Sequence, residues 1–177
     1  SNATALFRRV DQAGQVGWRQ YTNSRPEEAR ASVAAAYSHL VDHWQPGDDV
    51  FVFGAGSGAA CAQALARLLG TIGVLDGELR SYMLATYALP RTARTAQEWR
   101  HVTEVAAGLA EHDDITLPVR FLGLWDATRI RGTAGPVNVA AGRHAVAIDG
   151  APNLQRVDGV DELWFRGSHR DIVASPL

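Results

Sequence analysis

The chain is organised around one segment, which reads Asp49-Val-Phe-Val-Phe-Gly-Ala-Gly-Ser-Gly-Ala-Ala-Cys-Ala-Gln-Ala-Leu-Ala-Arg-Leu-Leu-Gly70. Its run Val50–Phe53 contains only β-branched and aromatic residues, which is typical of a strand buried on both faces of a parallel sheet. Three glycines at alternate positions follow, and then a small-residue helical pattern from Ala59 to Leu69. The segment therefore predicts a buried strand, a tight turn and a helix packed closely on the sheet.

The glycine turn has the frame of the nucleophile elbow of α/β hydrolases, displaced by one residue. That elbow reads Gly-x-Ser-x-Gly, with its serine at the sharp turn between strand and helix. In Gly54-Ala-Gly-Ser-Gly58 the central position is Gly56, and Ser57 comes one place late. The functional interpretation of the chain depends on this displacement.

The sequence on both sides of the elbow predicts alternating helices and strands. Upstream, the patterns predict a helix tail over 4–10, a strand over 15–21 and a helix from Pro26 to the turn at Pro46-Gly-Asp48. Downstream, they predict helices over 76–88 and 92–111, a strand over 118–125, a short helix from Asn138 to about Ile148 and a strand over 162–165. This alternation predicts an α/β fold, a three-layer α/β/α sandwich with a mostly parallel sheet. We expect a small helical cap over about 76–111.

The composition fits one globular domain. Hydrophobic residues make up 46% of the chain, charged residues 20%, and the net charge is −2. Such a charge gives no electrostatic reason to expect binding to nucleic acid or to an anionic membrane surface. No apolar run approaches the ~20 residues that a membrane helix needs. The single cysteine, Cys61, cannot form an internal disulfide.

The first residues, Ser1-Asn-Ala3, have the sequence of an expression-tag scar, so we expect residues 4–177 to form a single domain. Because Thr4 rather than methionine follows the scar, we also expect that an upstream strand, domain or signal peptide was removed.

Three polar residues follow the ends of predicted strands. They are Ser57, Asp126 and His169, and ligands of open α/β sheets bind outside the carboxyl ends of the strands. Serine, then aspartate, then histidine is also the chain order of the α/β-hydrolase triad. The same residue types favour turns at strand ends, so spacing alone leaves both interpretations open.

The chain resembles the uncharacterised α/β-hydrolase family that includes the lipase and phospholipase effectors of type VI secretion. The resemblance covers most of residues 5–173. It is carried by Pro46-Gly-Asp48, Val50-Phe-Val-Phe-Gly54, Gly58-Ala59, Ala62-Gln-Ala-Leu-Ala66, Phe121-Leu-Gly-Leu-Trp-Asp126, His144-Ala-Val-Ala-Ile-Asp149 and Leu163-Trp-Phe-Arg-Gly-Ser-His-Arg-Asp171.

The resemblance implies a triad that lacks its nucleophile. The Gly-Phe-Ser-Arg-Gly elbow of the family falls on Gly54–Gly58, so Gly56 stands at the nucleophile position and Ser57 replaces an arginine. The Trp-Asp pair of the family implies Asp126 as the triad acid, and its Gly-x-His-x-Asp element implies His169 as the base. A strand ending in Asp-Gly-Thr and a glycine run after the histidine, both usual in the family, have no match here.

Two functions follow from this pattern. In the first, the domain no longer cleaves esters, because glycine has no side chain to attack a carbonyl, and it acts by binding or in a structural role. In the second, Ser57 replaces the missing nucleophile in a lipase- or esterase-like hydrolase with His169 and Asp126. The side chain of Ser57 points about 100° around the helix from its neighbour, so the second function requires rewinding of the turn. A lipid or a small ester is the expected ligand, while oligomeric state and localisation stay open.

Other candidate residues favour structural roles. His39 and His43 lie at a spacing that can bind metal, but no third ligand is apparent, so we expect a solvated helix face and no metal. Cys61 fits a buried structural thiol, and His144 a structural residue. The Gly-x-Gly-x-Gly spacing does not match the dinucleotide fingerprint, so no cofactor is expected.

Overall fold

The computed structural model describes residues 2–12, 17, 19–21, 28–75, 77–110, 115–132, 135, 137–150 and 154–174. In chain order, its elements are α1 (Asn2–Gln12), α2 (Ala29–His43), β1 (Val50–Ala55), α3 (Ser57–Thr71), α4 (Gly77–Tyr87), α5 (Ala96–Ala110), β2 (Val119–Trp125), β3 (Gly142–Asp149), β4 (Asp161–Ser168) and α6 (His169–Ala174). Within this described part, no helix is long and apolar enough to cross a membrane.

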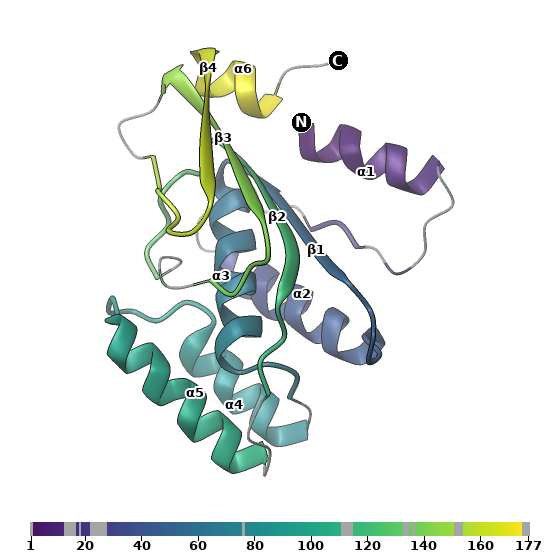
Figure 1. Cartoon of the computed structure of the whole chain (residues 1–177), viewed down its shortest axis with the longest axis vertical. Helices are drawn as coiled ribbons and strands as arrows, with labels where there is room; N and C mark the ends of the chain where they lie inside the picture. Colours follow the sequence, from purple (N-terminus) through teal and green to yellow (C-terminus); the bar gives the residue numbers. More distant parts are fainter. Residues whose placement is uncertain are drawn as a thin grey trace.

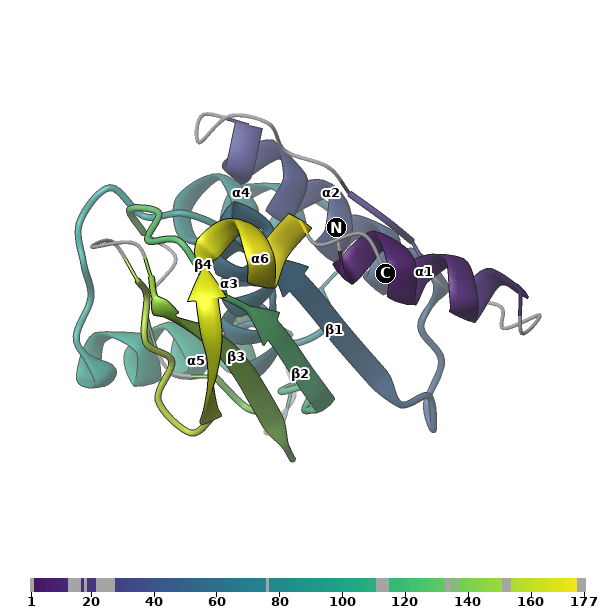
Figure 2. The same ribbon diagram turned by 90° about the horizontal axis from the view of Figure 1, so that it is seen from above.

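The sheet is parallel and has the order β1-β2-β3-β4. Helix α3 packs against β1 and β2, and α2 and α5 pack against α3 (Figure 1). Helix α6 follows directly from β4 and contacts β3 and β4, with α1 beside it (Figure 2). The predicted α/β fold with a parallel sheet is confirmed, and the carboxyl ends of the strands meet beside α6.

Close approach of α3 to β1 depends on small residues at the elbow. A Cβ built on Gly54 would lie 2.6 Å from the Cα of Ala59 and would also overlap the carbonyl oxygen of Gly58. On α3 itself, the alanines at 59, 60, 64 and 66 are completely buried. The predicted sequence of strand, glycine turn and small-residue helix is therefore confirmed.

The prediction that β1 is buried on both faces is wrong. Val50 and Val52 face α3, whereas Phe51 and Phe53 are 57% and 40% exposed. Phe53 instead meets the rings of Phe121 and Trp125 of β2. The apolar residues of β1 thus alternate between the core face of the sheet and an outer face where aromatic rings meet.

The short helix predicted between Asn138 and Ile148 is also wrong, because Gly142–Asp149 forms strand β3. His144 and Val146 are fully buried at alternate positions, which is a strand pattern. Pairing with β2 on one side and β4 on the other overrides the helical propensity of the alanines.

The remaining predicted elements lie close to the observed ones. The strand predicted over 118–125 is β2, and the strand predicted over 162–165 is β4, which extends to Ser168. The two helices predicted within 76–111 are α4 and α5. Their expected role as a cap stays a prediction, and in Figure 1 both lie beside the lower part of α3, away from α6. Of the strand predicted over 15–21, residues 17 and 19–21 have no strand structure, and the others lie outside the described residues.

A methyl group at Gly54 tests the close packing of α3. We expect Gly54→Ala to lower the free energy of unfolding by about 3 kcal/mol or more, because the new Cβ meets backbone atoms that cannot move independently. Urea denaturation measures the change. Gly108→Ala is the matched control, since Gly108 lies in α5 with no atom near its added Cβ. That change should stabilise the protein by about 0.5–1 kcal/mol, and equal effects of the two substitutions would contradict the packing.

Candidate functional site

Gly56 forms the sharp turn between β1 and α3. Its φ of 56° and ψ of −119° belong to a conformation that residues with a side chain adopt only under strain. The turn is fixed by hydrogen bonds in which the Gly56 N–H donates to the Trp125 carbonyl (2.8 Å) and the Gly56 carbonyl accepts from the Thr128 N–H (3.1 Å). The elbow is thus tied to the carboxyl end of β2.

Asp126 and His169 form a hydrogen-bonded pair beside this turn. Asp126 Oδ2 lies 2.6 Å from His169 Nδ1. The aspartate side chain is 2% exposed and that of the histidine 37%. Since a carboxylate can only accept, we assign the imidazole proton to Nδ1, which leaves Nε2 as an acceptor when the ring is neutral. The pair has the arrangement of a base and its orienting acid.

Strand β3 holds the aspartate in position. Asp126 Oδ1 accepts a hydrogen bond from the Ala147 N–H (2.9 Å), and the Asp126 N–H donates to the Ala145 carbonyl (2.7 Å). The next N–H, that of Ala127, donates to His144 Nε2 at 3.0 Å. Asp126 has a φ of 42° and is the only non-glycine residue with a positive φ in the described part of the chain. These three bonds to β3 maintain that unusual backbone conformation.

The imidazole of His169 faces the position of a side chain at Gly56. A Cβ built on Gly56 would lie 3.5 Å from His169 Nε2 and 3.6 Å from Val173 Cγ1, which is ordinary van der Waals contact. A hydroxyl on that Cβ could therefore come within hydrogen-bond distance of Nε2, about 2.6–3.2 Å. Gly56, Asp126 and His169, which the family resemblance implies as nucleophile position, acid and base, thus lie close together.

Ser57 is the first residue of α3 and is partly exposed. Among the described residues, none makes a hydrogen bond with its hydroxyl. Its N–H lies in the first turn of the helix, where N–H groups have no intrahelical acceptor, and the residue after the nucleophile donates this group to the oxyanion of a hydrolase. The structure therefore provides a backbone donor at Ser57, and among the described residues the Ser57 hydroxyl makes no hydrogen bond with His169.

The start of α6 positions His169. Ser168 and Asp171 form a cap in which Asp171 Oδ2 accepts from the N–H and the hydroxyl of Ser168, both at 2.8 Å. These bonds lower the pKa of Asp171. The sequence analysis recognised Asp171 only through the family motif, although the spacing Ser-x-x-Asp is itself a capping signal.

Sequence reasoning gave His144 a structural role but did not foresee its hydrogen bond to the Ala127 N–H. This histidine is fully buried, and its Nδ1 has no hydrogen-bond partner among the described residues. Burial lowers its pKa, which the carboxylates of Glu162 and Asp126 partly offset. A neutral ring is required, because only an unprotonated Nε2 can accept from the Ala127 N–H.

Two other candidate sites have simpler structures. The rings of His39 and His43 lie 4.2 Å apart, and His43 Nδ1 bonds to the His39 carbonyl at 2.7 Å. No group of three side chains that could hold a metal occurs in the described ranges. Cys61 is buried and forms no disulfide in the described part of the chain.

The pH dependence of stability tests the state of His144. Since its pKa in the folded protein lies below the ordinary 6.5, the unfolded chain binds a proton that the folded chain does not. The free energy of unfolding should be fully retained above about pH 6.5 and fall below it, by up to about 1.4 kcal/mol per pH unit. Urea denaturation over this range should show a smaller fall for His144→Gln. His39, whose pKa is also lowered, affects both proteins equally. Equal slopes would contradict a buried neutral His144.

The sequence matches one known protein family over most of its length. The sequence model described as "T6SS, Phospholipase effector Tle1-like, catalytic domain" matches residues 22–175. Among solved structures, the Tle1 effector bound to the VgrG spike of the type 6 secretion system is similar over 84% of this chain, with 20% identity and a TM-score of 0.41. The chain spans 30% of that effector chain. Comparison with curated proteins found no match. Because this family model matches residues 22–175, the chain belongs to the family of Tle1-like catalytic domains of type VI secretion phospholipase effectors.

Proposed function

We propose that this chain is a family member that binds a lipid or small ester at the elbow without cleaving it through a covalent intermediate. One observation carries the proposal: His169 Nε2 is directed at the side-chain position of Gly56, where no nucleophile is present. Membership of a phospholipase effector family supports an ester-bearing ligand.

Without a nucleophile at position 56, Asp126 and His169 alone cannot support the covalent step of ester cleavage. A base accelerates acyl transfer by taking a proton from the attacking group, so it contributes little when no attacking group is in place. Removing the serine of a hydrolase triad lowers kcat by about 10⁶-fold. The proposed module therefore keeps the orienting pair and the backbone donor of Ser57, which can hold an ester carbonyl, and lacks the covalent step.

Labelling with a fluorophosphonate tests which residue occupies the nucleophile position. We expect no labelling of the native protein and covalent labelling of Gly56→Ser, because the introduced hydroxyl would lie beside His169 Nε2. Intact-protein mass spectrometry with peptide mapping measures the modified residue. Gly56→Ser should also lower the free energy of unfolding by about 1–3 kcal/mol, since a serine at this φ and ψ is strained.

Two double variants control this experiment. Gly56→Ser with His169→Ala should not be labelled, whereas Gly56→Ser with Ser57→Ala should be labelled as fast as the single variant. Labelling of Ser57 in the folded native protein, lost in His169→Ala, would overturn the proposal and support an active hydrolase that uses Ser57.

Binding without turnover is tested by titrating the native protein with a short-chain phosphatidylcholine below its micelle concentration. Amide resonances of Ser57, Gly58 and His169 should shift, because a bound ester carbonyl faces the first turn of α3 and the imidazole. No fatty acid should be released, as measured by mass spectrometry. Shifts confined to other elements, or release of fatty acid that His169→Ala abolishes, would each contradict a non-cleaving ester site.

A further inference from the structure

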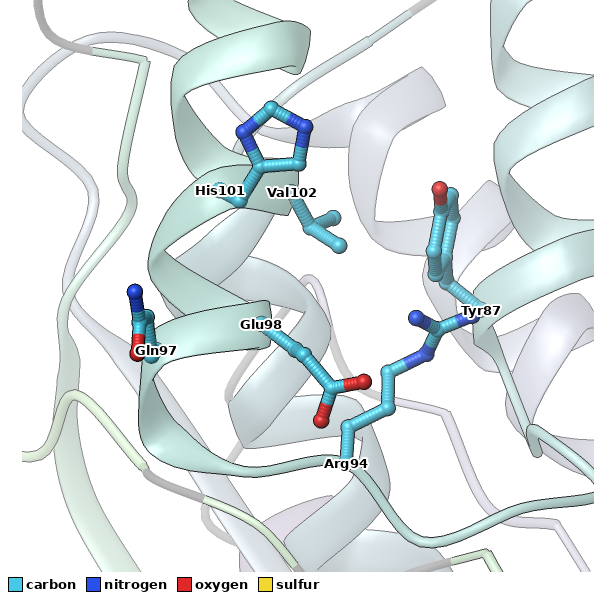
Figure 3. Close-up of a pocket in the computed structure, with 6 residues that line it drawn as sticks. All are labelled: Tyr87, Arg94, Gln97, Glu98, His101 and Val102. Carbon is cyan, nitrogen blue, oxygen red and sulfur yellow. The ribbon is translucent and has the colours of Figure 1, made fainter.

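A hollow lies between the end of α4 and the start of α5, and it shares no residue with the elbow. Its volume is about 410 Å³, and it is lined by Tyr87, Arg94, Gln97, Glu98, His101 and Val102. Figure 3 shows Arg94 reaching toward Tyr87 on one side, with Glu98, His101 and Val102 of α5 on the other. The walls thus combine one cation with an aromatic ring and an aliphatic side chain.

Arg94 lacks an anionic partner in this hollow. Its guanidinium carbon lies 5.0 Å from the centre of the Tyr87 ring and 5.8 Å from that of Trp99. No described residue accepts a hydrogen bond from the guanidinium, and its Nε is buried. A planar group held by two rings with its donors unused is ready to bind an oxyanion in bidentate fashion.

A second cation raises the positive potential at the same place. Arg67 lies 4.4 Å from the centre of the Trp99 ring and is fully buried. It donates hydrogen bonds to the carbonyls of Tyr87 (3.1 Å) and Ala88 (2.9 Å). Burial and the nearby charge of Arg94 lower the pKa of Arg67 to about 10, so it stays protonated at neutral pH. Two like charges on one indole favour an anion beside them.

The carboxylate in the hollow only partly offsets this charge. Glu98 Oε2 accepts from the N–H (2.6 Å) and the hydroxyl (2.9 Å) of Thr95, which caps α5. Glu98 makes no ion pair with Arg94 among the described residues, although the charge of Arg94 contributes to the lowered pKa of Glu98. The Glu98 carboxylate is thus engaged in capping α5, and the guanidinium donors of Arg94 stay unused among the described residues.

We propose that this hollow binds a small organic anion, whose carboxylate or phosphate group pairs with Arg94 while its apolar body lies against Tyr87 and Val102. The carboxylate of Glu98 disfavours a second negative charge, so a monoanion is the preferred ligand. The site is independent of the elbow, and its occupation does not require that the elbow bind an ester.

Titration followed by amide resonances of α5 tests the site, with 3-phenylpropionate and phenyl phosphate as probes. Both should bind, and 3-phenylpropionate should bind about tenfold or more tightly than the neutral 3-phenylpropanol, because hydrogen bonds to a charged partner are lost in the alcohol. Inorganic phosphate should bind more weakly than phenyl phosphate. Equal binding of the acid and the alcohol, or of inorganic and phenyl phosphate, would overturn the proposal.

Variants assign the binding to Arg94. Arg94→Gln should weaken 3-phenylpropionate binding about tenfold or more, and Arg100→Gln, an exposed arginine on the same helix, should leave it unchanged. In the Glu98→Gln variant, the glutamine can still cap α5. This variant should bind the anion more tightly, and a loss of folding cannot raise the affinity. Equal weakening by Arg94→Gln and Arg100→Gln, or weaker binding by Glu98→Gln, would contradict the site.

Discussion

The parallel register of β3 between β2 and β4 is the constraint on which the elbow site depends. Through Ala145 and Ala147, β3 binds the backbone and side chain of Asp126, and through His144 it binds the next N–H. Its other edge pairs with β4, the strand that leads into His169. A shift of β3 by one residue would reverse which of its side chains face the core and would separate acid from base. The pairing of β3 with its two neighbours therefore helps to hold Asp126 and His169 at their 2.6 Å separation.

Glycine at position 56 lets the sharp turn between β1 and α3 form without strain. A side chain at this φ and ψ would cost about 1–3 kcal/mol. Hydrogen bonds of Gly56 with the Trp125 carbonyl and the Thr128 N–H keep the turn in place. In the function that we propose, Asp126 and His169 thus keep their orientation beside a position that carries no nucleophile.

Local patterns in the sequence were enough to predict the parts of the fold that depend on local physics. The strand, turn and helix of Val50–Thr71 follow from residue size and backbone freedom, and α4 and α5 from helical spacing. Strand β3 was predicted as a helix because His144–Ile148 contains two alanines and its neighbours in the sheet come from distant segments. The exposure of Phe51 and Phe53 likewise depends on which elements cover the outer face, which no local pattern encodes.

The candidate site likewise has features that the local sequence predicts and features that it does not. Strand ends and chain order single out Asp126 and His169, but the direction of the imidazole toward Gly56 depends on how α6 begins. The support from His144 follows from the register of β3, and the hollow at Arg94 from the packing of α4 beside α5. The first two are relations between segments far apart in the sequence, whereas the hollow joins two helices that follow one another in the chain.

The imidazole of His169 is directed at the side-chain position of residue 56. A high-resolution crystal structure of the Gly56→Ser variant measures this directly. We expect the introduced hydroxyl oxygen within about 2.6–3.2 Å of His169 Nε2, with Asp126 still bonded to Nδ1. A hydroxyl directed away from the imidazole, or an Nε2 bonded instead to the hydroxyl of Ser57, would contradict it.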